Sequence, residues 1–175
     1  INMLVVLGGD GSFRGMEIFF KEHGISFCGI PSTIDNDING TQYCLGVDTV
    51  LNVIKDATDN IRDTASSFKR AFVIEVMGRD CGYLALVSAL TSGAEMCLIP
   101  EIPYSLEDLK KRYTKEIAEG RNYFIAIVSE ALKNSTPSGL TSTTVGRLPL
   151  PVTTMASNPE ESMASGTFPP AYDSE

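Results

Sequence analysis

The sequence predicts an α/β fold in which parallel strands form a middle layer and helices cover both of its faces. Short apolar runs alternate with longer amphipathic segments along the first 133 residues, and this alternation is typical of βαβ units. Loops rich in glycine or acidic residues directly follow three of the apolar runs, at the strand ends where open α/β folds bind ligands. The 175 residues are 43% hydrophobic and 21% charged, which is the balance of a globular protein.

The first half of the chain contains the clearest elements. Met3–Leu7 is an apolar run that stops at glycine, so it is expected to be a buried parallel strand. A helix is expected over residues 13–23, with one apolar face formed by Met16, Phe19 and Phe20. A second helix is expected over residues 47–65, with an apolar face formed by Leu51, Ile54 and Ile61. A strand is expected between them at residues 26–30.

The second half repeats the alternation. Strands are expected at residues 70–76, 96–99 and 123–128, and helices at residues 81–91 and 106–119. Ser105, with Asp108 three residues later, forms a capping pattern at the start of the last helix.

The first strand begins at residue 3, whereas a doubly wound domain seldom opens with its ligand-binding strand, so earlier strands are expected to be missing.

The composition changes after Lys133. Of the 42 residues from Asn134 to Glu175, 23 are Ser, Thr, Pro or Gly, and six of the nine prolines of the chain lie there. Few large apolar groups remain to offset the loss of conformational entropy, so residues 134–175 are expected to be a disordered or irregular tail.

Composition also excludes several classes of function. No apolar run reaches the roughly 18 residues that a membrane span needs, and no charged segment of a signal peptide opens the chain. The four cysteines form no C-x-x-C pair and there is one histidine, which favours reduced thiols in a cytosolic protein over a metal site of nitrogen and sulfur. A net charge of −8 argues against a broad nucleic-acid surface.

The first strand-end loop reads Gly8-Gly9-Asp10-Gly11-Ser12. Glycines let a backbone approach a phosphate closely, the amides of the following helix point at the anion, and an aspartate can hold Mg²⁺ bound to that phosphate. Ser12 is a candidate cap of the helix. A tight strand-to-helix turn with a capping serine explains the same residues equally well.

The second loop reads Pro31-Ser32-Thr33-Ile34-Asp35-Asn36-Asp37. Two aspartates one residue apart, close to a magnesium-phosphate loop, suit proton removal from a substrate hydroxyl and support of the metal. Clusters of Asn and Asp more often form a simple turn, and that alternative stays open from this loop alone.

The third loop, Met77-Gly78-Arg79, follows a strand and can present an arginine to a phosphate. Arg70 lies at the other end of the same strand, about 20 Å away by strand rise, so it serves either a surface ion pair or the site of a neighbouring subunit. Glu130 ends a further strand and can accept hydrogen bonds from sugar hydroxyls. For each of these residues a solvated surface role remains the plainer alternative.

In this order and at these intervals, the three loops resemble those of the 6-phosphofructokinase family of bacterial type. The resemblance runs from about Met3 to about Lys133 and includes Asp80-Cys81-Gly82, Ile99-Pro100-Glu101 and Ser129-Glu130. It implies a phosphofructokinase-like fold of three-layer domains, incomplete at both ends. It also implies a division into residues 1–46, part of a nucleotide-binding domain, residues 47–133, part of a fructose 6-phosphate-binding domain, and a tail.

The resemblance implies a kinase that transfers the γ-phosphate of ATP to the 1-hydroxyl of fructose 6-phosphate in a homo-oligomer, a tetramer in the family. Asp10 would bind the Mg²⁺ of ATP, Asp35 would be the base, and Asp37 and Arg79 would support the transition state. The resemblance further implies that ATP is bound by Gly9, Gly11 and Ser12. It implies that the sugar is bound by Thr33, Ile34, Asp35, Met77, Gly78, Arg79 and Glu130, and that Arg70 reaches the sugar-phosphate site of the adjacent subunit. It also implies an effector site at Arg62, Gly93 and Glu95.

Departures from the family pattern qualify these expectations. Members that use pyrophosphate tend to carry aspartate at Gly11 and lysine at Ser32, so this chain is expected to use ATP. Glu119 stands where the allosteric members tend to carry a cation, which argues against nucleotide regulation. The first phosphate loop and the later histidine-containing segment of the family have no counterpart, so full activity of this chain is not expected.

Two other interpretations remain from the residues. Glycine-glycine-aspartate-glycine loops also occur in NAD kinases and lipid kinases, although the second and third loops weigh against those. A non-catalytic regulatory or vestigial chain that pairs with a complete subunit is the alternative of a different class.

Overall fold

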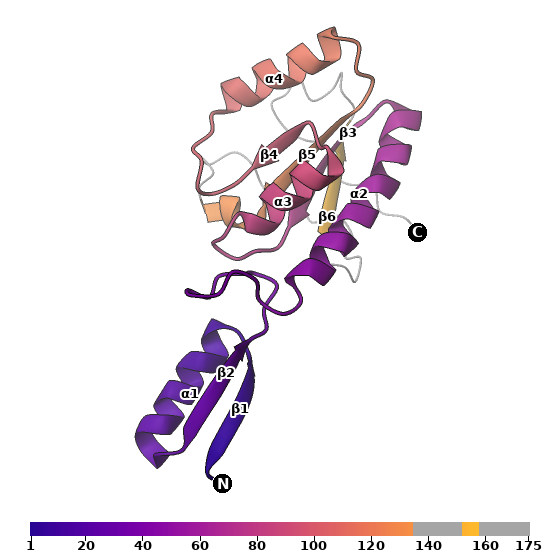
Figure 1. Ribbon diagram of the computed structural model, residues 1–175. Coiled ribbons are helices and arrows are strands. Elements are labelled where there is room, and N and C mark those ends of the chain that lie inside the picture. The colour runs from indigo at the N-terminus through magenta and orange to yellow at the C-terminus, as the bar shows by residue number, and fades with distance from the viewer. Residues whose placement is uncertain (135–151, 158–175) are drawn as a thin grey trace, which may run out of the picture.

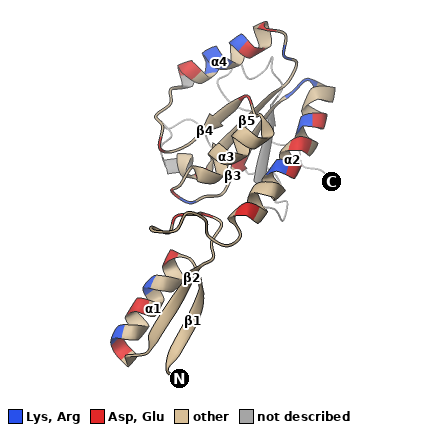
Figure 2. Cartoon of the chain, in the orientation of Figure 1, with Lys and Arg blue, Asp and Glu red and all other residues tan. Residues whose placement is uncertain are grey.

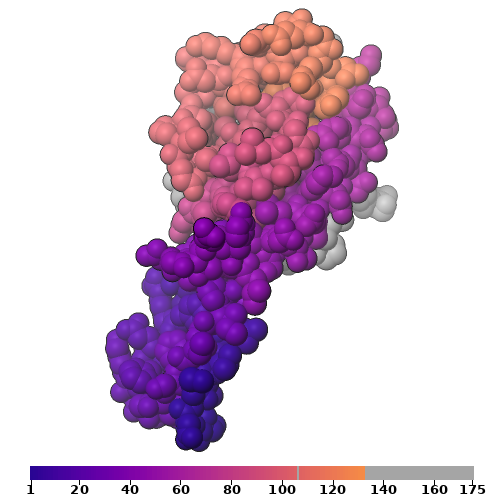
Figure 3. All heavy atoms as spheres, viewed as in Figure 1, coloured from indigo at the N-terminus to yellow at the C-terminus, as the bar shows by residue number. Residues whose placement is uncertain are grey.

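The computed structural model describes residues 1–134 and 152–157, and they fold around two separate sheets (Figure 1). The first sheet has the order β1-β2 and the second has the order β4-β5-β3-β6. In the space-filling view the first of these units, coloured indigo, projects from the larger body formed by the second (Figure 3). No helix in the described ranges has both the length and the apolar character to cross a membrane.

The smaller unit is one βαβ crossover. β1 (Met3–Gly8) and β2 (Ser26–Pro31) pair in parallel, with Met3 opposite Ser26 and Gly8 opposite Pro31. α1 (Asp10–His23) connects them and ends at Gly24, which adopts a left-handed conformation with φ 67°. A side chain at Gly29 would come within 2.8 Å of the Phe13 ring, so glycine at this position lets the helix pack closely on β2.

The larger unit has three layers, as the sequence predicts. β3 (Ala71–Val76), β4 (Met96–Leu98) and β5 (Phe124–Ser129) are parallel, and β6 (Val152–Ser157) pairs antiparallel with β3. α2 (Val47–Phe68) and α3 (Tyr83–Ser92) lie on one face, and α4 (Leu106–Ala118) lies on the other. The α/β fold class is therefore confirmed.

Alternation along the strands explains this layering. Ile74 and Val76 of β3 enter the core under α2 and α3, whereas Ala71 and Val73 face the smaller core under α4. Successive side chains of a strand point to opposite faces, so β3, β4 and β5 each contribute to both cores. α3 carries no charged residue, while α4 carries mixed acidic and basic ones (Figure 2).

Most predicted elements occur within a few residues of their expected bounds. Ser105 caps α4, because its hydroxyl accepts a 3.1 Å hydrogen bond from the Asp108 amide. The short 3-10 helix Glu130–Asn134 ends at the first residue of the segment expected to be irregular. Strand β6 lies inside that segment, so Val152–Ser157 departs from the expectation. The rest of the expected tail, residues 135–151 and 158–175, lies outside the described residues.

Candidate active site

The glycine-rich loop joins β1 directly to α1. The helix begins at Asp10 with Gly9 as its N-cap, and no side chain caps it, so the prediction that Ser12 caps this helix is wrong. Ser12 instead lies in the first turn, where a side chain at Gly8 would come within 2.6 Å of its Cβ. The turn therefore requires glycine at position 8 and presents Asp10 at the positive end of the helix dipole.

The first two loops lie against each other. The Ser32 amide donates a 2.9 Å hydrogen bond to the Gly8 carbonyl, and a side chain at Gly9 would come within 3.3 Å of the Thr33 Cβ. Gly11, in contrast, has no atom within 4 Å of the position of an added Cβ. The loops thus pack closely at Gly9 and leave open space at Gly11.

The second loop is held by its own polar groups. The Asp35 amide donates a 3.3 Å hydrogen bond to the Thr33 hydroxyl. Asn36 adopts a left-handed conformation with φ 53°, and its side chain accepts from the Cys44 amide at 2.9 Å and donates to the Gln42 carbonyl at 3.1 Å. Asn36 was not among the residues that the sequence singled out, because both of its partners lie beyond the motif.

Arg79 brings the three loops together. Its Nη1 lies 3.0 Å from Oδ2 of Asp37 and 3.5 Å from Oδ2 of Asp10. Hydrogen bonding and charge attraction from Asp37, and then charge attraction from Asp10, raise the pKa of Arg79 above its usual value. One residue from each of the three loops thus takes part in a single cluster of ion pairs.

Glu130 fixes the backbone of the third loop. Its Oε1 accepts hydrogen bonds from the amides of Gly78 at 3.0 Å and Arg79 at 2.7 Å. Gly78 has φ 142° and Arg79 has φ 54°, and left-handed conformations of this kind are disfavoured for residues with a side chain. The carboxylate from the end of β5 therefore stabilises the turn from which Arg79 reaches the two aspartates.

Glu130→Ala is expected to lower the free energy of unfolding by about 2 kcal/mol, because two backbone donors lose a charged acceptor. Glu130→Gln keeps a carbonyl oxygen at the same position and should lose about half as much. Urea unfolding followed by circular dichroism measures both. Equal losses in the two variants would contradict the assignment of Glu130 to this turn.

Asp35 lies near the acids Asp37 and Glu130 and near Arg79. Partial burial is the main cause that raises its pKa, and the nearby carboxylates of Asp37 and Glu130 raise it further, while Arg79 lowers it. A carboxylate with a raised pKa at a strand end is better suited to accept a proton near neutral pH than an ordinary surface aspartate is.

Two of the predicted sugar-binding residues, Ile34 and Met77, differ in how exposed their side chains are. The Ile34 side chain packs against the main hydrophobic core. Met77, the first residue of the third loop, is 42% exposed.

Arg70 lies far from this cleft. It precedes β3, at the end of the strand opposite to Arg79, and its guanidinium group stacks over the Phe68 ring with 5.4 Å to the ring centroid. The strand geometry expected from the sequence therefore holds, and Arg70 does not contribute to the cleft formed by its own chain.

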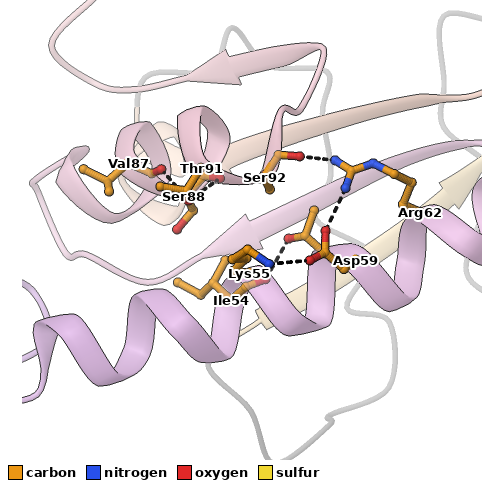
Figure 4. Close-up of polar contacts among 9 residues, drawn as sticks. Ile54, Lys55, Asp59, Arg62, Val87, Ser88, Thr91 and Ser92 are labelled. Carbon is orange, nitrogen blue, oxygen red and sulfur yellow. Dashed lines mark hydrogen bonds and ion pairs between the residues drawn. The ribbon is translucent and has the colours of Figure 1, made fainter.

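The predicted effector residues have internal partners. Arg62 donates to Asp59 at 2.7 Å and to the Ser92 carbonyl at the end of α3 (Figure 4). Glu95 is buried and accepts from Arg121 at 2.8 Å and from the Ile125 amide at 2.8 Å. Gly93 ends α3 with φ 67°. These residues thus join α2, α3 and β5 to one another.

The comparison with known proteins identifies the family. The model of the family described as phosphofructokinase matches residues 1–162. This chain belongs to the phosphofructokinase family. The match extends past Lys133, where the resemblance in the sequence ended.

Proteins named ATP-dependent 6-phosphofructokinase are similar to this phosphofructokinase-family chain. The one from Sulfurimonas denitrificans is 73% identical over 135 residues, covering 77% of this chain and 42% of its own length. The one from Sulfurovum sp. is 72% identical over 136 residues, with the same coverage of both chains. The chain thus spans about two fifths of the length of the curated relatives it matches.

Solved phosphofructokinases share the fold. The structure of phosphofructokinase from Saccharomyces cerevisiae has a TM-score of 0.69 at 35% identity, covering 75% of this chain and 21% of that one. A crystal structure of phosphofructokinase from Pichia pastoris has a TM-score of 0.68 at 31% identity, covering 74% and 15%. The arrangement of both sheets is therefore that of the family.

Proposed function

We propose that this phosphofructokinase-family chain carries the part of a kinase site that transfers the γ-phosphate of ATP to the 1-hydroxyl of fructose 6-phosphate. The observation that carries the proposal is the convergence of Asp10 and Asp37 on one guanidinium group, that of Arg79, with Asp35 in the same cleft. Phosphoryl transfer depends on positioning and charge stabilisation more than on covalent chemistry, and these residues supply both.

Asp35 acts as the base in this proposal. It accepts the proton of the 1-hydroxyl as the oxygen attacks the phosphorus, and its raised pKa brings it closer to the operating pH. Arg79 stabilises the negative charge that develops on the phosphoryl oxygens. Asp37 orients Arg79 through the 3.0 Å ion pair.

The donor set at the cleft suits Mg²⁺. Oxygens of Asp10 and Asp37 approach one cationic nitrogen of Arg79, which marks a position that a cation can share between them. No cluster of three or more potential metal ligands occurs within residues 1–134 and 152–157, but Mg²⁺ commonly takes one or two carboxylates together with substrate phosphates and waters. Asp10 would hold the ion near the Gly9–Ser12 backbone, where the ion would supply positive charge for the phosphates.

The sugar site needs a second subunit. Thr33 belongs to the second loop, Met77 and Gly78 belong to the third, and Glu130 bonds the Gly78 amide, whereas Arg70 lies at the far end of β3. Arg70 is therefore proposed to bind the sugar phosphate of a neighbouring copy in a cytoplasmic homo-oligomer, a tetramer by family likeness. The division into a nucleotide-binding part at residues 1–46 and a sugar-binding part at residues 47–133 follows the two sheets.

An effector site at Arg62, Gly93 and Glu95 would compete with contacts inside the fold. Arg62 and Glu95 already have internal partners, so an effector would have to replace these bonds. Glu119, which forms a 3.7 Å ion pair with Lys115, brings negative charge where an anionic nucleotide would require positive charge.

Isothermal titration of the purified chain with MgATP and with fructose 6-phosphate tests the proposal. Binding of both supports it, binding of neither leaves a non-catalytic chain, and binding of NAD in their place points to a different kinase class. A coupled assay for fructose 1,6-bisphosphate then measures turnover directly.

Gly11→Asp is expected to weaken MgATP binding at least tenfold while changing thermal stability by little. The added side chain meets open space in the fold, but its charge would repel the phosphates of ATP. Titration calorimetry and thermal unfolding separate the two effects, and Gly11→Asn provides the uncharged control of similar size. Unchanged ATP affinity in Gly11→Asp would refute the argument that Gly11 determines the phosphate donor.

A further inference from the structure

Asn36 separates the two acids of the second loop, and its side chain both accepts and donates a hydrogen bond. It accepts from the Cys44 amide at 2.9 Å and donates to the Gln42 carbonyl at 3.1 Å. One amide group therefore closes a loop of eight residues onto the segment that carries Asp35 and Asp37. The side-chain amide suits this role because its nitrogen donates while its oxygen accepts, so one uncharged group can bond two backbone partners at once.

The backbone at Asn36 also favours asparagine. Its φ of 53° lies in the left-handed region, which asparagine tolerates better than most residues. Asn36 lies between Asp35, which is partly buried, and Asp37, which forms the ion pair with Arg79. A change at Asn36 would therefore rotate one acid relative to the other.

The loop that Asn36 closes is anchored at its far end. Cys44 is 4% exposed and belongs to the main hydrophobic core, and the next amide, that of Leu45, donates to the Pro31 carbonyl at 2.9 Å. Between the two partners of Asn36, the Tyr43 ring meets the Tyr83 ring edge-on, with 6.2 Å between centroids. Tyr83 begins α3, just after the loop of Arg79.

We infer that Asn36 is a positioning residue, which fixes the acids on both sides of it against the sugar-binding cleft by tying their loop to the core at Cys44. The inference rests on the proposed function only in naming the ligand that the acids meet. The tie itself is a property of this chain.

The reactivity of the Cys44 thiol tests the tie on the full chain. Asn36→Gly keeps the left-handed backbone but removes both hydrogen bonds, and it is expected to raise the rate of Cys44 labelling by a thiol reagent at least tenfold. Exposed Cys28 is the internal reference, read on its own peptide by mass spectrometry. Asn36→Asp keeps the acceptor for the Cys44 amide and should stay within threefold of the wild-type rate.

A matched control removes an asparagine hydrogen bond elsewhere. Asn52→Ala deletes the 2.9 Å bond from the Asn52 side chain to the Asp48 carbonyl on the exposed face of α2, and Cys44 labelling should not change. An unchanged Cys44 rate in Asn36→Gly, or an equal rise in Asn52→Ala, would overturn the inference. So would rapid labelling of Cys44 in the wild-type chain, because a closed loop protects the thiol.

Ligand titration separates positioning from general stability. Asn36→Gly should weaken fructose 6-phosphate binding about tenfold and MgATP binding by a smaller factor, because only one of the two acids at the proposed metal position, Asp37, lies next to Asn36, whereas Asp10 lies on the glycine-rich loop. Equal weakening of both ligands would mean that Asn36 acts through stability alone. If the wild-type chain binds neither ligand, the proposed function fails, while the labelling result still decides whether Asn36 holds the loop.

Discussion

Asp35→Asn is expected to lower kcat by roughly 10²–10⁴-fold, with fructose 6-phosphate affinity changed by less than threefold. A general base contributes about that much, and its effect is on the transition state rather than on ground-state binding. The measurement requires a protein with the full length of the family. A chimera in which residues 1–134 replace the matching segment of the Sulfurimonas denitrificans relative supplies one, assayed by coupled detection of fructose 1,6-bisphosphate.

The pH dependence provides an independent check on Asp35. Its pKa is raised by burial and by Asp37 and Glu130, and the base works only when it is ionised. The acid limb of the kcat profile should therefore lie above the usual aspartate pKa of about 3.9, and it should disappear in Asp35→Asn. A similar acid limb in the variant would assign that limb to another group.

Stability distinguishes loss of catalysis from loss of fold in this variant. The pKa of Asp35 is higher in the folded state than in the unfolded state. The protonated carboxyl therefore stabilises the fold at a pH below the unfolded-state pKa, and this stabilisation is lost as the pH rises through the folded-state pKa. At pH 7 the charged group disfavours the folded state, so the neutral asparagine should unfold at the same or a higher urea concentration. Earlier unfolding of Asp35→Asn would contradict this reasoning.

Arg79→Gln is expected to lower kcat by roughly 10²–10³-fold, the typical cost of removing one donor that stabilises transition-state charge. It also removes the cation shared by Asp10 and Asp37. Because Arg79 lowers the pKa of Asp35, the acid limb of the kcat profile should move to higher pH in this variant. Rates over a pH series in the same chimera measure both effects.

Two controls test whether the effect belongs to Arg79. Arg79→Lys keeps the charge but not the forked donor group, so the acid limb should stay near its wild-type position while kcat remains reduced. Arg14→Gln removes the exposed arginine that pairs with Asp10 alone, at 3.0 Å, and should change kcat by less than threefold. A larger loss in Arg14→Gln than in Arg79→Gln would mean that Asp10, and not the shared ion pair, is the critical partner.

Much of the architecture could be predicted from the sequence, because its signals are local. Hydrophobic periodicity located the nine helices and strands of residues 3–129, and the order of three loop motifs located the cleft. The observed helix starts differ from the expected ones where no capping side chain marks the start in the sequence. α1 begins three residues earlier than expected because Gly9 caps it without a side chain, and α3 begins two residues later because a turn closes from the Cys81 amide to the Gly78 carbonyl.

The remaining features depend on contacts between distant residues. Glu130 accepts from amides more than 50 positions away, and nothing local distinguishes it from a solvent-facing glutamate. The bridge made by Asn36 depends on how the chain returns at Gln42 and Cys44. Strand β6 comes from a segment whose composition favours irregular structure, and its pairing partner β3 lies about 80 residues earlier.

The two sheets share no backbone ladder within the described residues, and half-exposed ion pairs around Arg79 join them. Dissolved electrolyte weakens such pairs, since the screening length falls from about 10 Å at 0.1 M to about 3 Å at 1 M ionic strength. The hydrogen bonds within each sheet are far less sensitive to it. The contribution of Arg79 to the alignment of the two units thus weakens as salt is added, whereas the hydrogen bond from the Leu45 amide to the Pro31 carbonyl, which also links them, is far less affected.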